Sequence, residues 1–200
     1  MNTTSPIRQR ALILRRLACY GAIIVLLTSA AQPARAAFHL WTFQQMYTNS
    51  SGSLQFIELK TTSGSQNSLG GVTLKVTSGA SSNQITLPSN LTGDTTNKVF
   101  LIGTSGVQAA GGPAPDYTIP SNFLFQGGGT IQLVGGSSAT YTALPTDGSS
   151  ARNVPASTNV VNSPTNFAGQ TGVVPEPTSI VLLGTGAAFL FFGIRRRRAA

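Results

Sequence analysis

The sequence predicts an all-β domain between an N-terminal signal peptide and a single C-terminal transmembrane helix. In the middle of the chain, short runs of apolar and β-branched residues alternate with spacers rich in Gly, Ser, Asn and Pro. That alternation is typical of strands joined by turns, and no window of the middle has a good helical period. At each end, a stretch of uncharged residues lies next to arginines, as in segments that enter a membrane.

Residues 1–36 have the composition of a signal peptide. An apolar stretch at 17–31 is preceded by the basic residues Arg8, Arg10, Arg15 and Arg16. Ala34 and Ala36 occupy the small-residue positions that signal peptidase requires, so we expect the mature chain to begin at Ala37. The adjacent pair of arginines leaves twin-arginine export as an alternative, but the surrounding residues fit ordinary secretion better.

The central domain is expected to occupy residues 37–146. Its predicted strands lie near 38–47, 54–60, 71–77, 83–87, 98–103, 130–134 and 139–144. Strands at this spacing indicate a β-sandwich or a β-barrel. Residues 147–172 are rich in Ser, Thr, Asn and Pro and hold few apolar residues, so we expect an extended final segment or a linker there.

A series of short apolar motifs runs through the first half of this domain. They are Phe56-Ile57-Glu58-Leu59, Asn67 and Leu69, Gly71-Val72-Thr73-Leu74, Ile85-Thr86-Leu87-Pro88, and Phe100-Leu101-Ile102-Gly103. Their order is similar to that of lamin-tail-like domains, in which a strand bearing Ile-Glu-Leu is followed by an Asn-containing turn. The resemblance implies an Ig-like β-sandwich.

The C-terminal region has the features of a membrane anchor. Residues 178–194 carry no charge and would span roughly 25 Å as a helix, against about 30 Å for the hydrocarbon core. The stop-transfer residues are Arg195, Arg196, Arg197 and Arg198. Arginines are costly inside a bilayer and remain on the cytoplasmic side. The alternative, a buried C-terminal helix of a soluble protein, does not explain the arginine cluster.

Residues 173–200 combine three features in a fixed order. The motif residues Val174, Pro175, Glu176 and Pro177 precede the apolar stretch, which the arginines close. This order resembles the PEP-CTERM sorting signal of Gram-negative bacteria. The resemblance implies recognition of the motif by exosortase, a membrane-embedded cysteine transpeptidase-like enzyme, which would release or transfer the protein to the cell surface or the exopolysaccharide matrix. A chance Pro-Glu-Pro beside a simple anchor is the alternative.

The formal net charge of +8 comes from the two ends of the chain. Within residues 37–174, Lys60, Lys75, Lys98 and Arg152 balance Glu58, Asp94, Asp116 and Asp147. A neutral domain has no basic face for nucleic acid, so we expect no nucleic-acid partner. The single cysteine, Cys19, lies in the predicted signal peptide, so the mature domain forms no disulfide.

The polar residues of the domain do not form a recognisable catalytic or metal-binding set. His39 is the only histidine, and a catalytic base or a zinc site needs further partners. Glu58 is expected to pair with a lysine across strands or to accept a backbone hydrogen bond. Asp94 is expected to form a turn, with a calcium ligand as the alternative. We therefore predict no catalytic residues, no metal and no cofactor.

Three aromatic residues, Trp41, Tyr117 and Tyr141, are candidates for a sugar-stacking platform. The sequence favours a non-catalytic structural or interaction module of the cell envelope or exopolysaccharide matrix. It would be exported through the inner membrane, anchored transiently, and then placed at the cell surface, in the outer envelope or outside the cell. A carbohydrate-binding module is the alternative, and an enzyme of unfamiliar type is a weaker one.

Overall fold

A computed structural model describes residues 38–174 of the chain. Several predicted features lie outside these residues. They are the signal peptide with its cleavage site, motif residues 175–177, the helix at 178–194 and the arginine cluster. No helix within 38–174 is long and apolar enough to cross a membrane.

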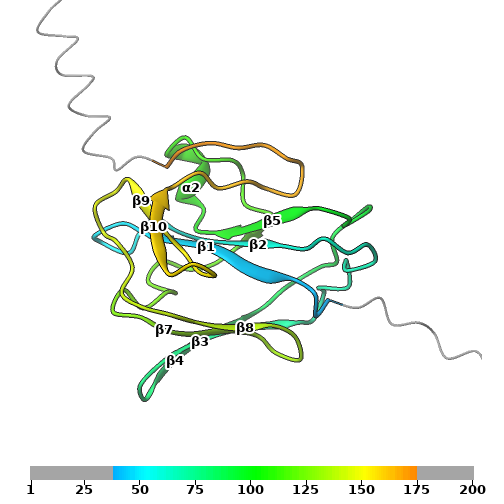
Figure 1. The fold of residues 1–200 in the computed structure, drawn as a ribbon, viewed down its shortest axis with the longest axis horizontal. Coiled ribbons are helices and arrows are strands. Elements are labelled where there is room, and N and C mark those ends of the chain that lie inside the picture. The colour runs from blue at the N-terminus through cyan, green and yellow to red at the C-terminus, as the bar shows by residue number, and fades with distance from the viewer. Residues whose placement is uncertain (1–37, 175–200) are drawn as a thin grey trace, which may run out of the picture. The chain divides into compact units, whose positions relative to one another are not determined.

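The strands of residues 38–174 form two sheets, which are drawn one above the other in Figure 1. Sheet A has the order β10 (Thr158–Val161), β9 (Ser150–Asn153), β1 (Thr42–Thr48), β2 (Gln55–Lys60), β5 (Val99–Gly103) and β6 (Tyr117–Thr118). Sheet B has the order β4 (Ser81–Thr86), β3 (Thr73–Ser78), β7 (Gly129–Leu133) and β8 (Ser138–Tyr141). All pairings are antiparallel except that of β5 with β6. The short helix α2 (Gly106–Ala109) follows β5.

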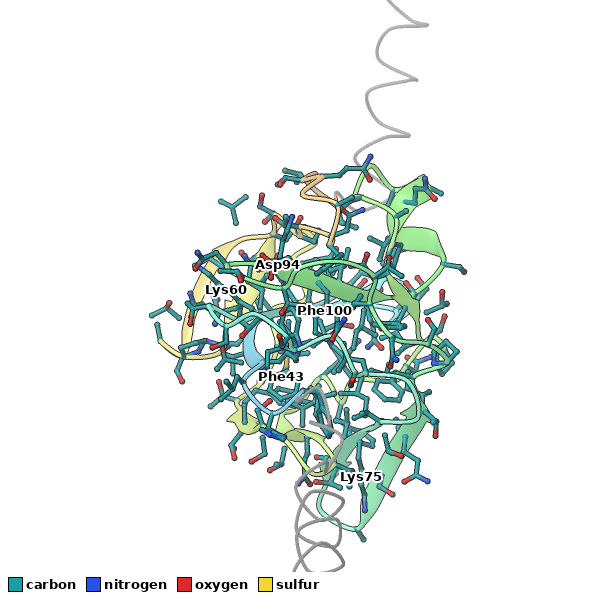
Figure 2. All side chains as sticks on the ribbon, turned by 90° about the vertical axis from the view of Figure 1, so that its right-hand side faces the viewer. Phe43, Lys60, Lys75, Asp94 and Phe100 are labelled. Atoms are coloured by element: carbon teal, nitrogen blue, oxygen red, sulfur yellow. The ribbon has the colours of Figure 1, made fainter. Side chains whose placement is uncertain are left out.

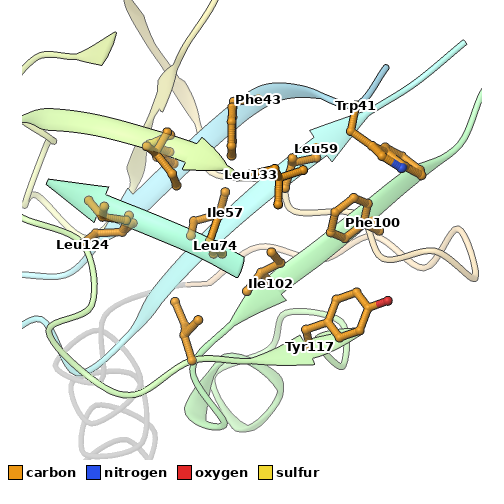
Figure 3. Packing of buried hydrophobic residues seen from close by; sticks show 14 of the residues in the cluster. Trp41, Phe43, Ile57, Leu59, Leu74, Phe100, Ile102, Tyr117, Leu124 and Leu133 are labelled. Carbon is orange, nitrogen blue, oxygen red and sulfur yellow. The ribbon is translucent and has the colours of Figure 1, made fainter. Parts of the chain in front are cut away.

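The main hydrophobic core lies between the two sheets. Alternation along β2 turns Ile57 and Leu59 toward sheet B, where they join Leu74 of β3 (Figure 3). Trp41 packs edge-on against Phe100 of β5, with ring centroids 4.6 Å apart. Because all five side chains are 0% exposed, this interior fixes the register of both sheets.

A second hydrophobic core lies on the opposite face of sheet A. Tyr47 of β1 and Phe56 of β2 stack there with ring centroids 5.2 Å apart and an interplanar angle of 16°. Val107 of α2 and Val174 cover them. The strands in the centre of sheet A are therefore covered on both faces, which accounts for the burial of every residue of β2 except Lys60.

All seven predicted strands are present, with shifted ends. The largest shift is in β1, which begins at Thr42 instead of residue 38 and carries a bulge between Phe43 and Gln45. The prediction missed β6, β9, β10 and the single turn of α2. These elements are two to four residues long, too short to show a hydrophobic period.

Residues 147–172, predicted to be an extended final segment or a linker, contribute two strands to sheet A. They contain β9, which pairs with β1, and β10, which pairs with β9 at the edge of sheet A. The segment buries few side chains, which are those of Ala151, Val154, Asn162, Pro164 and Asn166. Hydrogen bonds replace burial, since the Arg152 guanidinium donates to the carbonyls of Ala143 and Ser157 at 2.6 and 3.1 Å.

Candidate functional site

The last described segment, residues 162–174, lies against the outer face of sheet A and is called the strap below. Figure 1 shows it in orange on the side of sheet A that faces away from sheet B. A bridge between Thr165 and Thr171 closes it into a hairpin-like loop. The strap leads directly into the Pro-Glu-Pro sequence, so its attachment determines how the domain meets the C-terminal motif.

Glu58 holds the first half of the strap. It lies on β2, on the face of sheet A away from the main core, as strand alternation predicts. Its Oε2 accepts a hydrogen bond from the Thr165 amide at 2.8 Å. Burial raises the pKa of the Glu58 carboxyl, although this bond and the charge of Lys60 oppose the shift. The predicted backbone hydrogen bond is thus confirmed, and its partner is the strap.

Asp116 holds the middle of the strap from the loop before β6. Its Oδ2 accepts hydrogen bonds from the amides of Leu101 at 2.8 Å and Phe167 at 2.9 Å. One carboxylate oxygen therefore joins β5 to the strap. Burial raises the pKa of the Asp116 carboxyl, against the lowering effect of these amides. The ring of Phe167, which belongs to the strap, has the Lys98 ammonium 5.6 Å from its centre.

Asn162 and Val174 close the strap at its two ends. The Val174 amide donates to Asn162 Oδ1 at 2.7 Å, and Asn162 Nδ2 donates to the Val174 carbonyl at 3.1 Å. Asn162 Nδ2 also donates to the Gly148 carbonyl at 3.2 Å. Both residues are fully buried. The role of Asn162 was not predicted, and its only signal in the sequence is the turn-forming Asn-Ser-Pro.

Two glycines allow the end of the strap to lie close to the chain that follows α2. A Cβ atom on Gly172 would collide with the Gly111 carbonyl oxygen. A Cβ atom on Gly112 would lie 2.8 Å from side-chain atoms of both Val107 and Val174. The close packing around Val174 therefore depends on the lack of a side chain at Gly112 and at Gly172.

The three aromatic residues predicted to stack on sugars are buried. Trp41 is 0% exposed and donates from Nε1 to the Gln66 carbonyl at 2.7 Å, while Tyr117 and Tyr141 are each 4% exposed. The Tyr117 hydroxyl donates to the Ser89 carbonyl at 2.9 Å, and burial raises the pKa of both tyrosines to about 12. The predicted platform is wrong, because these rings pack in the core and their polar atoms bond to the backbone.

The remaining predicted polar residues hold local turns or lie at the surface. Asp94 accepts hydrogen bonds from the Thr96 amide and hydroxyl at 3.1 and 2.9 Å, as expected of a turn former, and they lower its pKa. Asp147 accepts from Ser149 and Ser150, which lower its pKa. His39 is exposed beside Phe38. Within residues 38–174, no group of three or more His, Cys, Asp or Glu residues could hold a metal ion.

The outer face of sheet B differs from that of sheet A because it is uncovered and polar. Register brings Gln84, Lys75, Gln132 and Ser138 into one row across the four strands, with Lys75 labelled in Figure 2. A parallel row holds Ser82, Thr77, Thr130 and Thr140. All eight side chains are exposed or half-buried, and none is acidic or aromatic. The face thus presents hydroxyl and amide groups with a single positive charge.

Comparison with known proteins identifies the C-terminal region. Residues 173–198 match the PEP-CTERM protein-sorting motif. No curated protein and no solved structure matches the chain. The matched range includes Val174, which the sequence analysis assigned to motif recognition and which the structure places in the second core. The chain therefore carries a PEP-CTERM sorting motif, which indicates an exported protein that exosortase processes and whose destination is the cell surface or the extracellular space.

Proposed function

We propose that the mature domain is a non-catalytic structural or interaction module of the cell envelope or exopolysaccharide matrix. In this proposal, signal peptidase cuts before Ala37, and residues 178–194 anchor the chain in the membrane until exosortase acts. The Ig-like topology implied by the resemblance to lamin-tail-like domains remains a prediction.

The hydrogen bonds accepted by the acidic side chains of residues 38–174 are the main support for this proposal. Glu58 and Asp116 bind strap amides, and Asp94 and Asp147 each close a turn. General acid–base catalysis needs a carboxyl or imidazole within reach of a substrate, and paired carboxylates in the case of glycosidases. Here the carboxylates stabilise loops instead, which supports a structural role for the polar residues of the domain.

Incubation with matrix polymer tests the non-catalytic role. The mature protein is purified from the surface fraction of an exporting host and incubated with the exopolysaccharide of that host. We expect the chain-length distribution of the polymer to stay unchanged over many hours. Shortening of the polymer that depends on the protein and persists after further purification would contradict the proposal.

Carbohydrate binding without catalysis is the second candidate, and the outer face of sheet B favours it. Hydroxyl and amide side chains in adjacent rows can exchange hydrogen bonds with the hydroxyls of a neutral polysaccharide. Gln84 and Gln132 lie on either side of Lys75 in one of these rows. This candidate replaces the aromatic platform, because its binding groups lie on an exposed sheet face.

Calorimetry with the purified exopolysaccharide tests this candidate. The double variant Gln84→Ala/Gln132→Ala should weaken binding roughly thirtyfold, because each of the two lost hydrogen bonds contributes about 1 kcal/mol. Gln108→Ala is the matched control, since Gln108 is exposed on α2, on the other side of the domain. Equal affinity of both variants, or no heat of binding for the wild type, would exclude this face as the binding site.

A further inference from the structure

The strand β4 forms one edge of sheet B and has none of the usual features that protect an edge (Figure 1). It has six residues, whereas the other edge strands β6, β8 and β10 have two, four and four. Folded proteins commonly protect such an edge with a charge, a proline or a bulge. The Ser-Ser-Asn-Gln-Ile-Thr sequence of β4 contains neither a charge nor a proline, and its register with β3 is unbroken. The edge is therefore suited to pairing with another strand.

The pairing with β3 determines which backbone groups of β4 are available to another strand. The Leu87 amide donates to the Val72 carbonyl at 2.9 Å, so the backbone of Leu87 faces β3. Bonded and non-bonded pairs alternate along an antiparallel ladder, so the residues at 81, 83 and 85 also bond to β3. The amides and carbonyls of Ser82, Gln84 and Thr86 therefore point away from β3. All three residues are exposed, and β3 is the only strand within residues 38–174 that pairs with β4.

We propose that β4 pairs with the β4 strand of a second copy of this chain, antiparallel and about a two-fold axis at Gln84. In this register Gln84 lies opposite Gln84 of the second copy, and Ser82 lies opposite Thr86. Every outward-pointing amide and carbonyl of the strand then has a partner, because each such pair exchanges two hydrogen bonds. Sheet B continues through both copies, and the two-fold axis uses up this edge in each of them, so the assembly is a closed dimer.

The side chains on both faces of β4 fit this register. On the outer face, the two Gln84 amides can donate to and accept from each other, and the hydroxyls of Ser82 and Thr86 can do the same. On the inner face, Asn83 lies opposite Ile85 of the second copy. Ile85 is half-buried and packs against the main core, so pairing would cover the apolar surface that it still exposes.

The charges of the domain allow two copies to approach each other. The basic and acidic side chains of residues 38–174 balance, so the copies carry no net repulsion. Lys75 lies beside Gln84 on β3. The two Lys75 residues of the dimer would be three strand spacings apart, about 14 Å, which exceeds the Debye length of about 8 Å at physiological salt.

The proposed interface consists of one strand pair and is therefore small. We expect a weak dimer with a Kd of about 10–100 µM. Such a dimer would be populated where the protein is concentrated and would present the outer faces of both sheets B as one surface. This self-association goes beyond the proposed role of the domain, and it does not depend on polysaccharide binding.

Charged variants of the mature protein test the pairing by sedimentation equilibrium without polysaccharide. Gln84→Lys places two lysines opposite each other at the axis, and their repulsion should weaken the dimer at least about fivefold. Gln132→Lys is the matched control, because Gln132 also lies beside Lys75 on the outer face but on β7, two strands from the edge. It should leave the Kd within about twofold of the wild-type value. Both side chains are exposed, so both variants should keep the wild-type unfolding midpoint.

An equimolar mixture of Gln84→Lys and Gln84→Glu tests the register itself. Each variant alone should dimerise at least about fivefold more weakly than the wild type, and the mixture should return to within about twofold of it, because opposite charges now meet at the axis. A mixture that fails to restore the dimer would overturn the proposal, as would equal effects of Gln84→Lys and Gln132→Lys.

Two results for the wild type would also overturn the proposal. The first is a protein that stays monomeric up to about 0.5 mM, well above the expected Kd. The second is recovery from the surface fraction in a complex with a different protein that Gln84→Lys does not form. That partner, instead of a second copy, would then occupy the edge of β4.

Discussion

The two sheets of this domain use their outer faces in opposite ways. The outer face of sheet A is covered by α2 and the strap, which bury the stacked rings of Tyr47 and Phe56. The outer face of sheet B carries rows of Ser, Thr and Gln and is exposed. The strap that covers sheet A continues in the sequence into the sorting motif, whereas the outer face of sheet B remains free for an interaction.

The comparison also separates stability from function. Residues under the strap are buried and bonded, so their substitution should destabilise the fold. Residues on the outer face of sheet B are solvated, so their substitution should leave the fold intact.

Phe56→Ala should have the largest effect. Truncation of a fully buried phenylalanine removes its packing and leaves a cavity beside Tyr47, which costs about 3–5 kcal/mol. Denaturant unfolding of the mature protein measures the loss. Val161→Ala is the control, because Val161 is 70% exposed and its truncation should change stability by less than about 0.5 kcal/mol. Equal effects of the two variants would mean that the strap leaves Phe56 accessible to water.

Gly172→Ala should detach the end of the strap. The new Cβ atom would collide with the Gly111 carbonyl, so we expect a loss of about 1–3 kcal/mol or local release of the segment. Limited proteolysis of residues 162–174 reports release directly. Gly127→Ala is the matched control, since nothing lies within 4 Å of its built Cβ. Resistance of Gly172→Ala equal to that of Gly127→Ala would show that the strap does not need this close approach.

Asn162→Ala should destabilise the domain by about 1–3 kcal/mol, because it leaves backbone groups of Val174 without partners in the interior. Asn159→Ala, on the exposed part of β10, is its control and should have little effect. Thermal unfolding compares the two. If Asn162→Ala melted at the wild-type temperature, the bonds to Val174 would contribute nothing to the fold.

The two buried carboxylates should make stability depend on pH. Burial raises the folded-state pKa values of Glu58 and Asp116 above their ordinary values of 4.5 and 3.8. As pH falls from neutrality, the folded state binds these protons before the unfolded state does, so the free energy of unfolding rises through the folded pKa and levels off below the ordinary pKa. Asp94 and Asp147 act in the opposite sense, because their pKa values are lowered.

Glu58→Gln isolates one of these contributions. The amide oxygen of Gln can still accept the Thr165 bond, but the group no longer titrates. Subtracting the unfolding free energy of the variant from that of the wild type at each pH cancels the effects of Asp94 and Asp147. The difference should move in favour of the wild type as pH falls from 7 toward the ordinary carboxyl value. A difference that is flat, or that moves the other way, would contradict the burial of Glu58.

Gln132→Ala should have the smallest effect on the fold. The side chain lies exposed in the middle of the outer face of sheet B, so its loss should change stability by less than about 0.5 kcal/mol. Chemical denaturation of the mature protein checks this. A loss above about 1 kcal/mol would mean that this face is structural, in the same way as the face under the strap.

Sequence patterns predicted the strands whose apolar and β-branched runs stand out from the turn-rich spacers around them. Ile57 and Leu59 alternate with Phe56 and Glu58, and both pairs lie on the expected faces. The edge strand β10 was missed because it is only four residues long, which is too short to show a hydrophobic period. Strand addition at an edge depends on backbone hydrogen bonds, which composition does not reveal.

The sorting motif was predictable because its recognition depends on linear order. The burial of Trp41, Tyr117 and Tyr141 was not, since an aromatic side chain near the end of a strand can face either way until the surrounding strands are placed. The role of Asn162 depends on Val174, which is twelve residues away and approaches it only when the strap has folded back. Long-range hydrogen bonds of this kind leave no local pattern.

Hydrogen exchange at the Val174 amide of the mature protein tests most directly whether the strap belongs to the fold. The account predicts exchange at least about a hundredfold slower than in an unstructured peptide, because the amide is buried and bonded to Asn162. Exchange within about tenfold of the unstructured rate would contradict it. The sorting motif would then follow a flexible tail, and the outer face of sheet A would be open.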